Sequence, residues 1–174
     1  MNNLELVLGG ARSGKTGYAL EIAKSFGDRV TWIATAEAYD DEMQDRINNH
    51  KAERPAHWKT IESSLKLSNA LLESAEDNRC VVVDCLTLWV SNWICKDEEE
   101  AFIKEREAFM QALQNSSGKI VLVSNEVGWG IVPDNALSRR FRDTAGRLHQ
   151  DIAKIAMSVT LVVAGIPMHI KTSK

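Results

Sequence analysis

An eight-residue loop near the start of the chain is the strongest constraint on its fold. The loop matches the pattern G-x-x-x-x-G-K-T and follows the apolar run from Leu4 to Leu8. In this pattern backbone N–H groups point at phosphate oxygens, the lysine reaches the terminal phosphates and the threonine hydroxyl can bind Mg²⁺. A helix that starts near Gly14 would add its positive N-terminal end. The sequence therefore predicts a nucleotide phosphate loop, made of Gly9, Gly10, Ala11, Arg12, Ser13, Gly14, Lys15 and Thr16.

The length and charge of the chain favour one domain that binds a small molecule. Its 174 residues are enough for a single domain, residues 1–174, that buries roughly 70% of its unfolded surface. The net charge is −3 and no stripe of Lys and Arg stands out, so composition gives no support to nucleic-acid binding. No signal-peptide pattern and no run of roughly 18 apolar residues occurs, so we expect a cytoplasmic protein without a membrane span.

Short apolar runs alternate with helical patterns along the chain. Buried strands are expected over residues 4–8, 30–34, 80–83, 119–123 and 160–164. Helices are expected over residues 15–26, 40–51, 64–74, 86–95, 98–114 and 135–157. The last helix has apolar residues every three or four positions, which gives it one buried stripe. This alternation predicts an α/β fold of the P-loop NTPase type, with a mainly parallel sheet flanked by helices.

Two carboxylates follow predicted strands, at the edge of the sheet where ligands of parallel sheets gather. Asp84 comes directly after the strand 80–83, where an acidic residue beside a phosphate loop helps to hold Mg²⁺. The alternative is that Asp84 only caps the helix that begins at Leu86. Glu126 lies beyond the strand 119–123 and could be a base, a group near the metal or a simple loop acid.

A polar segment over residues 40–51 carries a histidine that could act as a nucleophile. Arg46 and His50 are four residues apart, so a helix would place them on one face. A neutral imidazole is a good nucleophile toward phosphorus, and a guanidinium could hold the phosphate under attack. A histidine on a polar helix is, however, usually an ordinary surface residue. The spacing alone leaves both interpretations of His50 open.

Several sequence blocks, taken in order, resemble one enzyme family. Besides the phosphate loop they are Ile33-Ala34-Thr35-Ala36, Asp41-Glu42-Met43 with Arg46-Ile47 and His50, Arg54-Pro55 with Trp58-Lys59-Thr60 and Glu62, Val83-Asp84-Cys85-Leu86-Thr87-Leu88-Trp89 with Asn92, Ser124-Asn125-Glu126-Val127-Gly128, and Arg140-Phe141-Arg142-Asp143 with Gly146-Arg147. From about Leu4 to Ile170 the chain resembles the bifunctional adenosylcobinamide kinase and adenosylcobinamide-phosphate guanylyltransferase of cobalamin biosynthesis.

The resemblance implies two reactions on the aminopropanol arm of a corrinoid. ATP or GTP first phosphorylates the hydroxyl of that arm. A histidine then takes GMP from GTP, releases pyrophosphate and passes the GMP to the corrinoid phosphate, which gives adenosylcobinamide-GDP. In this sequence the guanylylated histidine of the family falls at His50, with Lys15 as the other catalytic residue.

The same resemblance implies a cofactor, an assembly and a set of nucleotide contacts. Mg²⁺ is the implied cofactor, with Thr16 and Asp84 as its ligands, and a homotrimer is the implied assembly. Thr16 replaces the family's common Ser but keeps the hydroxyl. The implied contacts beyond the phosphate loop are Ala34, Thr35, Ala36, Lys51, Ala52, Glu53, Arg54, Glu62 and Asp84.

Two residues depart from the family pattern, and two other functions compete with it. Trp129 stands where Met or Leu is common, and His149 stands where Asn is usual. A kinase of another small molecule, with a structural His50, would share the phosphate loop. A GTP-dependent switch fits less well because no N-K-x-D motif occurs and the D-x-x-G at residues 143–146 lies inside a helical pattern.

Overall fold

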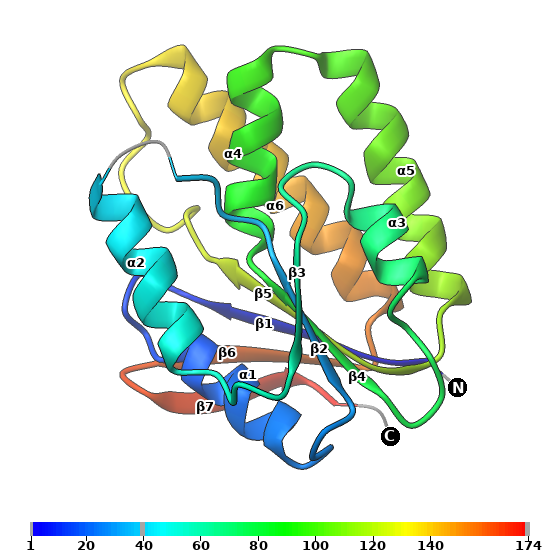
Figure 1. The fold of residues 1–174 in the computed structure, drawn as a ribbon. Helices are drawn as coiled ribbons and strands as arrows, with labels where there is room; N and C mark the ends of the chain where they lie inside the picture. Colours follow the sequence, from blue (N-terminus) through cyan, green and yellow to red (C-terminus); the bar gives the residue numbers. More distant parts are fainter. Residues whose placement is uncertain (1, 39–40, 173–174) are drawn as a thin grey trace.

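In a computed structural model, which describes residues 2–38 and 41–172, the chain forms a seven-stranded sheet with helices on both faces (Figure 1). The side chains of residues 2, 42, 43, 46 and 50 lie outside the described part. The strands are β1 (Asn2–Gly9), β2 (Val30–Ala34), β3 (Lys59–Glu62), β4 (Cys80–Asp84), β5 (Gly118–Asn125), β6 (Ser158–Val163) and β7 (Ile166–Lys171). The helices are α1 (Lys15–Lys24), α2 (Asp41–Ala52), α3 (Leu67–Leu72), α4 (Leu86–Lys96), α5 (Glu99–Asn115) and α6 (Ala136–Ile155).

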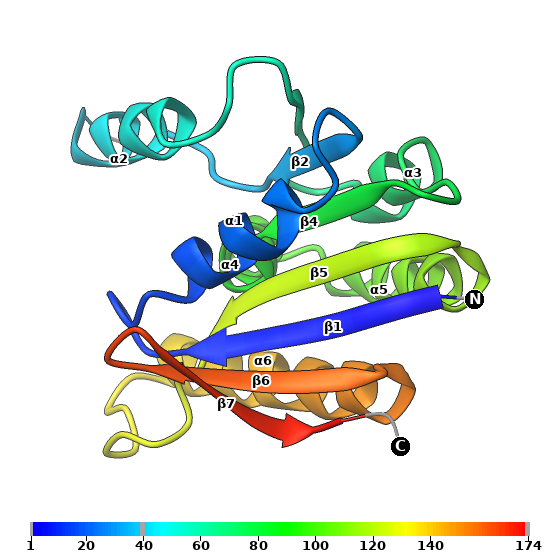
Figure 2. The same cartoon turned by 90° about the horizontal axis from the view of Figure 1, so that it is seen from below.

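The sheet has the order β3-β2-β4-β5-β1-β6-β7, and every neighbouring pair is parallel except β6 and β7. Strand β1, which leads into the phosphate loop, therefore lies near the middle, between β5 and β6. Figure 2 shows α1 on one face of the sheet and α4, α5 and α6 on the other. The mainly parallel α/β architecture predicted from the sequence is confirmed.

Alternating side chains of β1 fill the two halves of the core. Leu4 and Leu6 pack with α3, α4, α5 and α6, whereas Val7 packs with α1. On the larger side Trp89 contacts the rings of Phe102 and Phe109, with centroids 5.5 and 5.2 Å away. Buried on both faces, the central strands have the continuous apolar character that made them recognisable. No helix within the described ranges is long and apolar enough to cross a membrane.

Two strands at the edges of the sheet, β3 and β7, are not predicted by the sequence pattern. Strand β3 is largely exposed and polar, and β7 is an exposed antiparallel strand that pairs only with β6. An edge strand needs no continuous apolar run, so neither showed the expected signal. Strand β6 ends one residue earlier than predicted because Ala164 and Gly165 form its turn with positive φ angles of 51° and 77°.

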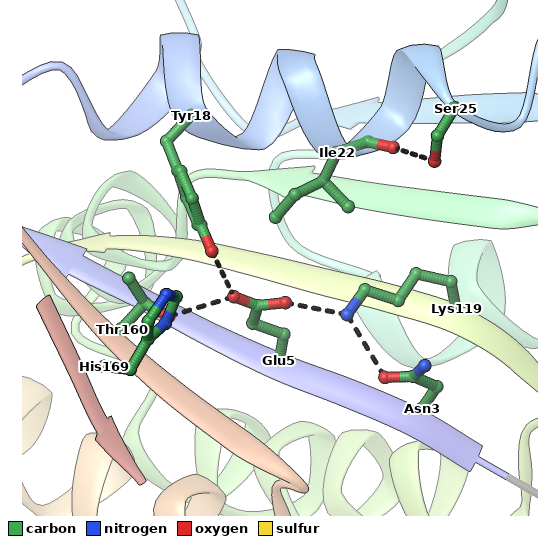
Figure 3. A network of polar contacts seen from close by, with 8 residues as sticks. All are labelled: Asn3, Glu5, Tyr18, Ile22, Ser25, Lys119, Thr160 and His169. Atoms are coloured by element: carbon green, nitrogen blue, oxygen red, sulfur yellow. Dashed lines mark hydrogen bonds and ion pairs between the residues drawn. The ribbon is translucent and has the colours of Figure 1, made fainter. Parts of the chain in front are cut away.

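A buried carboxylate joins β1 to three other elements (Figure 3). Glu5 accepts hydrogen bonds from Lys119 of β5 at 2.7 Å, from Thr160 of β6 at 3.0 Å and from Tyr18 of α1 at 3.0 Å. The Thr160 hydroxyl also lies 3.1 Å from His169 Nδ1. Burial raises the pKa of Glu5, but Lys119 and the two hydroxyls outweigh it and bring the pKa below its ordinary value of 4.5.

The variant Glu5→Gln should lower the free energy of unfolding by about 2 kcal/mol at neutral pH, because Lys119 loses its buried charge partner. Since the folded pKa of Glu5 is depressed, its contribution is complete above the ordinary pKa and disappears as the pH falls through the folded value. The gap between the variant and the wild type should therefore narrow in acid. Urea unfolding followed by circular dichroism at neutral pH and at about pH 3 measures both effects. Glu21→Gln, at an exposed ion pair on α1, is the control, and an equal loss there would contradict the prediction.

Candidate active site

A cleft of about 1210 Å³ opens at the carboxyl ends of the central strands, beside α1 and α2. Most of the nucleotide contacts expected from the sequence line it: Ala11, Arg12, Ser13, Gly14, Lys15, Thr16, Ala34, Ala36, Lys51, Glu53, Arg54, Glu62 and Asp84. Gly9, Gly10, Thr35 and Ala52 are not among the residues that line it. The side chain of His50 lies outside the described part, and its neighbours Asn49 and Lys51 line the cleft.

The phosphate loop is shaped by its glycines and by the turn between β6 and β7. Gly14 has a φ of 94° and caps α1, which begins at Lys15. Only glycine adopts this backbone conformation without strain. A Cβ at Gly14 would also lie 3.0 Å from the Cα of Gly165. Gly165 N donates to Ser13 O at 2.8 Å, so the outside of the loop is held by this turn.

Lys15 is buried at the floor of the loop, with its Nζ donating to Gly10 O at 3.0 Å. Burial lowers the pKa of Lys15, while the Cys85 thiol and the Asp84 carboxyl act in the opposite direction. A cationic nitrogen here, next to the loop amides, is the group that the terminal phosphates of a nucleotide require.

Asp84 ends β4 and lies opposite Ala34 in the register of β2. The N-cap position of α4 is Cys85, without a side-chain hydrogen bond, so Asp84 is not its N-cap residue. Asp84 lines the cleft, as a residue near the phosphates would. The buried Thr35 hydroxyl donates to Cys85 O at 2.7 Å and accepts from Cys85 N at 2.9 Å, which fixes the turn after β4.

Arg54 presents a guanidinium with unused donors to the cleft. Its Cζ lies 4.7 Å from the ring centroid of Trp32, and its Nε and Nη1 are buried without a hydrogen-bond partner among the described residues. Burial lowers the pKa of Arg54, and the carboxylates of Asp84, Glu53 and Glu62 oppose that effect. Buried donors of this kind are normally satisfied, so they fit an anionic ligand such as a phosphate group.

Other residues of the cleft escaped the sequence analysis. Ser63 and Ser64 follow β3, and they were missed because that edge strand was not recognised. The sequence marked Asn125 only as part of a block that resembles the family, without a role. Glu126 does not line the cleft; its Oε1 accepts from Gly128 N at 2.6 Å, which favours the loop-acid interpretation. The described residues contain no cluster of three or more His, Cys, Asp and Glu that could hold a metal ion.

The loop, the strand order and the position of the cleft define a protein with the P-loop NTPase fold. An ATPase from a bacterial type III secretion system has a TM-score of 0.55 with this chain at 11% identity, over 92% of this chain and 51% of that one. The RadB recombinase has a TM-score of 0.53 at 16% identity, over 92% and 74% of the two chains. Likenesses at such low identity show the fold alone.

The chain belongs to the cobinamide kinase / cobinamide phosphate guanyltransferase family, whose model matches residues 5–170. It is 50% identical to the bifunctional adenosylcobalamin biosynthesis protein CobP of Pseudomonas aeruginosa, over 96% of both chains. It is 40% identical to the bifunctional protein CobU of Escherichia coli, over 95% of this chain and 98% of that protein. The resemblance found in the sequence is thereby confirmed.

The variant Gly9→Ala should destabilise the protein by about 1 to 3 kcal/mol, because the new Cβ would lie 2.7 Å from the backbone oxygen of Val162 and would clash with Ser13 Oγ. Gly10→Ala is the matched control, since a Cβ there meets nothing within 4 Å. Thermal unfolding of the two variants measures the difference. Equal melting temperatures would show that the loop is not packed as tightly against β6 as described.

Proposed function

We propose that this chain phosphorylates adenosylcobinamide with a nucleoside triphosphate and then transfers GMP from GTP, through His50, to adenosylcobinamide phosphate. The products of the second reaction are adenosylcobinamide-GDP and pyrophosphate. The observation that carries the proposal is the family match over residues 5–170. The phosphate loop at the floor of the cleft supports it, because both reactions are displacements at phosphorus.

In the kinase step the hydroxyl oxygen of the corrinoid arm attacks the γ-phosphorus of ATP or GTP. The new O–P bond forms as the bond from the γ-phosphorus to its bridging oxygen breaks; ADP or GDP leaves, and the hydroxyl proton passes to water. Lys15 and the loop N–H groups stabilise the charge on the phosphate oxygens. The protein mainly positions the reactants, which is the largest part of catalysis in such transfers.

In the second reaction a ring nitrogen of His50 attacks the α-phosphorus of GTP. An N–P bond forms and pyrophosphate leaves; an oxygen of the corrinoid phosphate then attacks the same phosphorus and displaces the imidazole. The position of α2 supports this role, because Asn49 and Lys51, on either side of His50, line the cleft. Arg54 and Lys15 are two of the cationic side chains of the cleft that can hold the triphosphate.

Mg²⁺ is the cofactor that we propose, with the Thr16 hydroxyl and the Asp84 carboxylate as its protein ligands. Both residues line the cleft and both offer the oxygen donors that this cation prefers. Mg²⁺ at nucleotide sites is usually held by one or two side chains together with the phosphates, so a larger protein cluster is not required. When bound, it would neutralise charge on the phosphate oxygens.

We further propose a cytoplasmic homotrimer. Large apolar side chains that remain exposed on the described chain support self-association. Ile131 is 97% exposed and Trp129 77% exposed in the loop before α6, and Ile166, Met168 and Ile170 are exposed along the edge strand β7. Patches of this kind usually mark contact surfaces. The number of three subunits comes from the family resemblance, and light scattering of the purified protein tests it.

The variant His50→Ala should abolish the covalent labelling of the protein by α-labelled GTP and should retain kinase activity, because the γ-phosphorus reaction does not use the imidazole. His57→Ala is the control: His57 is exposed beside Asp28, at 3.2 Å, and its removal should leave labelling intact. Denaturing gels of labelled protein, with a separate kinase assay, provide the measurement. Undiminished label on the His50→Ala protein would refute the assignment.

The covalent intermediate should be a phosphoramidate, which is labile to acid and stable to alkali. Incubation of the wild type with adenosylcobinamide, Mg²⁺ and GTP should yield adenosylcobinamide phosphate and then adenosylcobinamide-GDP, identified by mass. Labelling by GTP with the opposite acid and alkali stability would point to another nucleophile. Slow GTP hydrolysis without corrinoid products would instead favour a GTP-binding switch.

A further inference from the structure

Asn125 occupies a central place at the floor of the cleft, and the two proposed reactions leave it without a role. It is the last residue of β5, the strand between β1 and β4, and it lies opposite Gly9 in the register of β1. The next backbone amide, that of Glu126, donates to Gly9 O at 3.0 Å. Asn125 is therefore fixed beside Gly9, the first residue of the phosphate loop. The strand on the other side of β5 is β4, which ends at Asp84.

One atom of the half-buried Asn125 side chain lacks the hydrogen bond that a buried acceptor needs. Asn125 Oδ1 is buried without a partner among the described residues, yet the residue lines the cleft. Buried polar atoms in native proteins almost always have a partner, so an exception at the floor of a binding cleft indicates a group that a ligand completes. A carboxamide can serve two ligand groups at once, because it has two N–H donors and a carbonyl acceptor.

A chain of buried hydrogen bonds holds Asn125 from behind. The backbone N–H of Asn125 donates to Thr87 Oγ1 at 2.6 Å. Thr87 Oγ1 lies 3.1 Å from Ser124 Oγ, which lies 2.7 Å from Nε2 of His149. Thr87, Ser124 and His149 are all buried, and they belong to α4, β5 and α6. The residue that departs from the family pattern, His149, thus anchors the strand end that carries Asn125.

One arrangement of protons uses every group of this hydrogen-bond network. In it Thr87 accepts from the Asn125 backbone amide and donates to Ser124, and Ser124 donates to Nε2 of His149. The imidazole is then neutral with its proton on Nδ1, 4.0 Å from Glu126 Oε2. Burial lowers the pKa of His149, and Glu126 opposes that effect. With a neutral His149 that accepts a hydrogen bond from Ser124, the Asn125 amide, the Thr87 hydroxyl and the Ser124 hydroxyl all have acceptors.

The position of Lys15 identifies which phosphate Asn125 faces. The lysine of a phosphate loop reaches the terminal phosphates, and here Lys15 Nζ lies 3.0 Å from Gly10 O, next to the residue opposite Asn125. The terminal phosphate of a nucleotide is therefore expected at this end of the loop. An ionised phosphate only accepts hydrogen bonds, so it takes the amide N–H, which leaves Oδ1 for a hydroxyl donor.

We propose that Asn125 is a catalytic residue of the kinase step, which contacts the terminal phosphate through its amide N–H and the attacking corrinoid hydroxyl through Oδ1, held in place by the chain Thr87–Ser124–His149. The inference rests on the proposed kinase function for the identity of the hydroxyl. The bonds formed and broken are those of the kinase step above. Asn125 exchanges no proton; it aligns the hydroxyl with the phosphorus and stabilises the charge that develops there.

The first test measures binding, so it does not depend on catalysis. A GTP analogue with a non-hydrolysable β–γ bridge and GDP are titrated calorimetrically with Mg²⁺, all in the His50→Ala background so that no covalent GMP forms. Adding Asn125→Ala should weaken analogue binding about tenfold and leave GDP binding within about twofold. Asn69→Ala, an exposed position on α3, is the matched control. The proposal would be overturned if Asn125→Ala weakened the binding of the GTP analogue and of GDP equally, or weakened neither. It would also be overturned if the His50→Ala protein bound the analogue and GDP with equal affinity.

The second test measures turnover on the otherwise wild-type protein. Asn125→Ala should lower kcat of corrinoid phosphorylation about a hundredfold, whereas the rate of self-guanylylation at His50 should fall far less. The isosteric variant Asn125→Asp should have the same effect, and it keeps the test valid if Asn125→Ala misfolds. Equal loss of both reactions would contradict a contact at the terminal phosphate. If the wild type makes no phosphorylated corrinoid, the proposed function fails, and the binding test still decides the role of Asn125.

The supporting role of His149 has its own readout. His149→Ala should lower kcat of the kinase step several-fold with little change in KM for the nucleotide, and should have no further effect on kcat when Asn125 is already Ala. A merely structural role would lower the melting temperature equally in both backgrounds and would leave the two kcat effects additive. Additive effects would therefore remove His149 from the proposal.

Discussion

The close approach of two backbone segments, the phosphate loop and the turn between β6 and β7, is the constraint on which the rest of the structure depends. Gly14 and Gly165 lie so near each other that a Cβ on the first would crowd the second, and the amide of Gly165 donates to Ser13 O. This turn occupies the outer side of the loop. The loop is thereby stabilised in one conformation before any ligand binds, which reduces the entropic cost of binding.

Strand β5 keeps that loop in register with the rest of the cleft. Near its start, Lys119 pairs with the buried Glu5 of β1 on the face that α1 covers. Near its end, Ser124 joins α4 and α6 on the opposite face through Thr87 and His149. Polar contacts thus fix β5 at both ends. Hydrogen bonds depend on direction and distance, so they specify the position of the strand more sharply than the apolar side chains between them. Slippage of β5 would separate the strand end from the phosphate loop, so these buried polar groups are structurally costly and functionally useful.

The sequence predicted most of the fold because the central strands are apolar throughout and the phosphate loop has a specific pattern. It failed at β3 and β7, whose exposure removes the apolar signal on which strand recognition depends. The site was harder to predict. Lys15 and Asp84, which line the cleft, could be singled out because each sits in a recognisable motif. The proposed role of Asn125 depends instead on which strands are neighbours, and periodicity does not reveal strand order. His149 stood out only as a departure from a family pattern; its contact with Ser124 is a product of tertiary packing.

The two proposed reactions place different demands on the same cleft, and the structure distributes them over different elements. Lys15 begins α1, and the loop amides lie between β1 and α1, where contacts with the surrounding backbone hold them in place for a triphosphate. Helix α2, which carries His50, consists mostly of polar residues. Ile47 is half-buried, and the other described side chains of the helix are exposed. A helix whose described side chains are mostly exposed is coupled only weakly to the core. The nucleophile proposed on this helix, His50, can therefore be positioned for the α-phosphorus without disturbing the residues proposed to hold the terminal phosphate, so one phosphate loop can serve both proposed reactions.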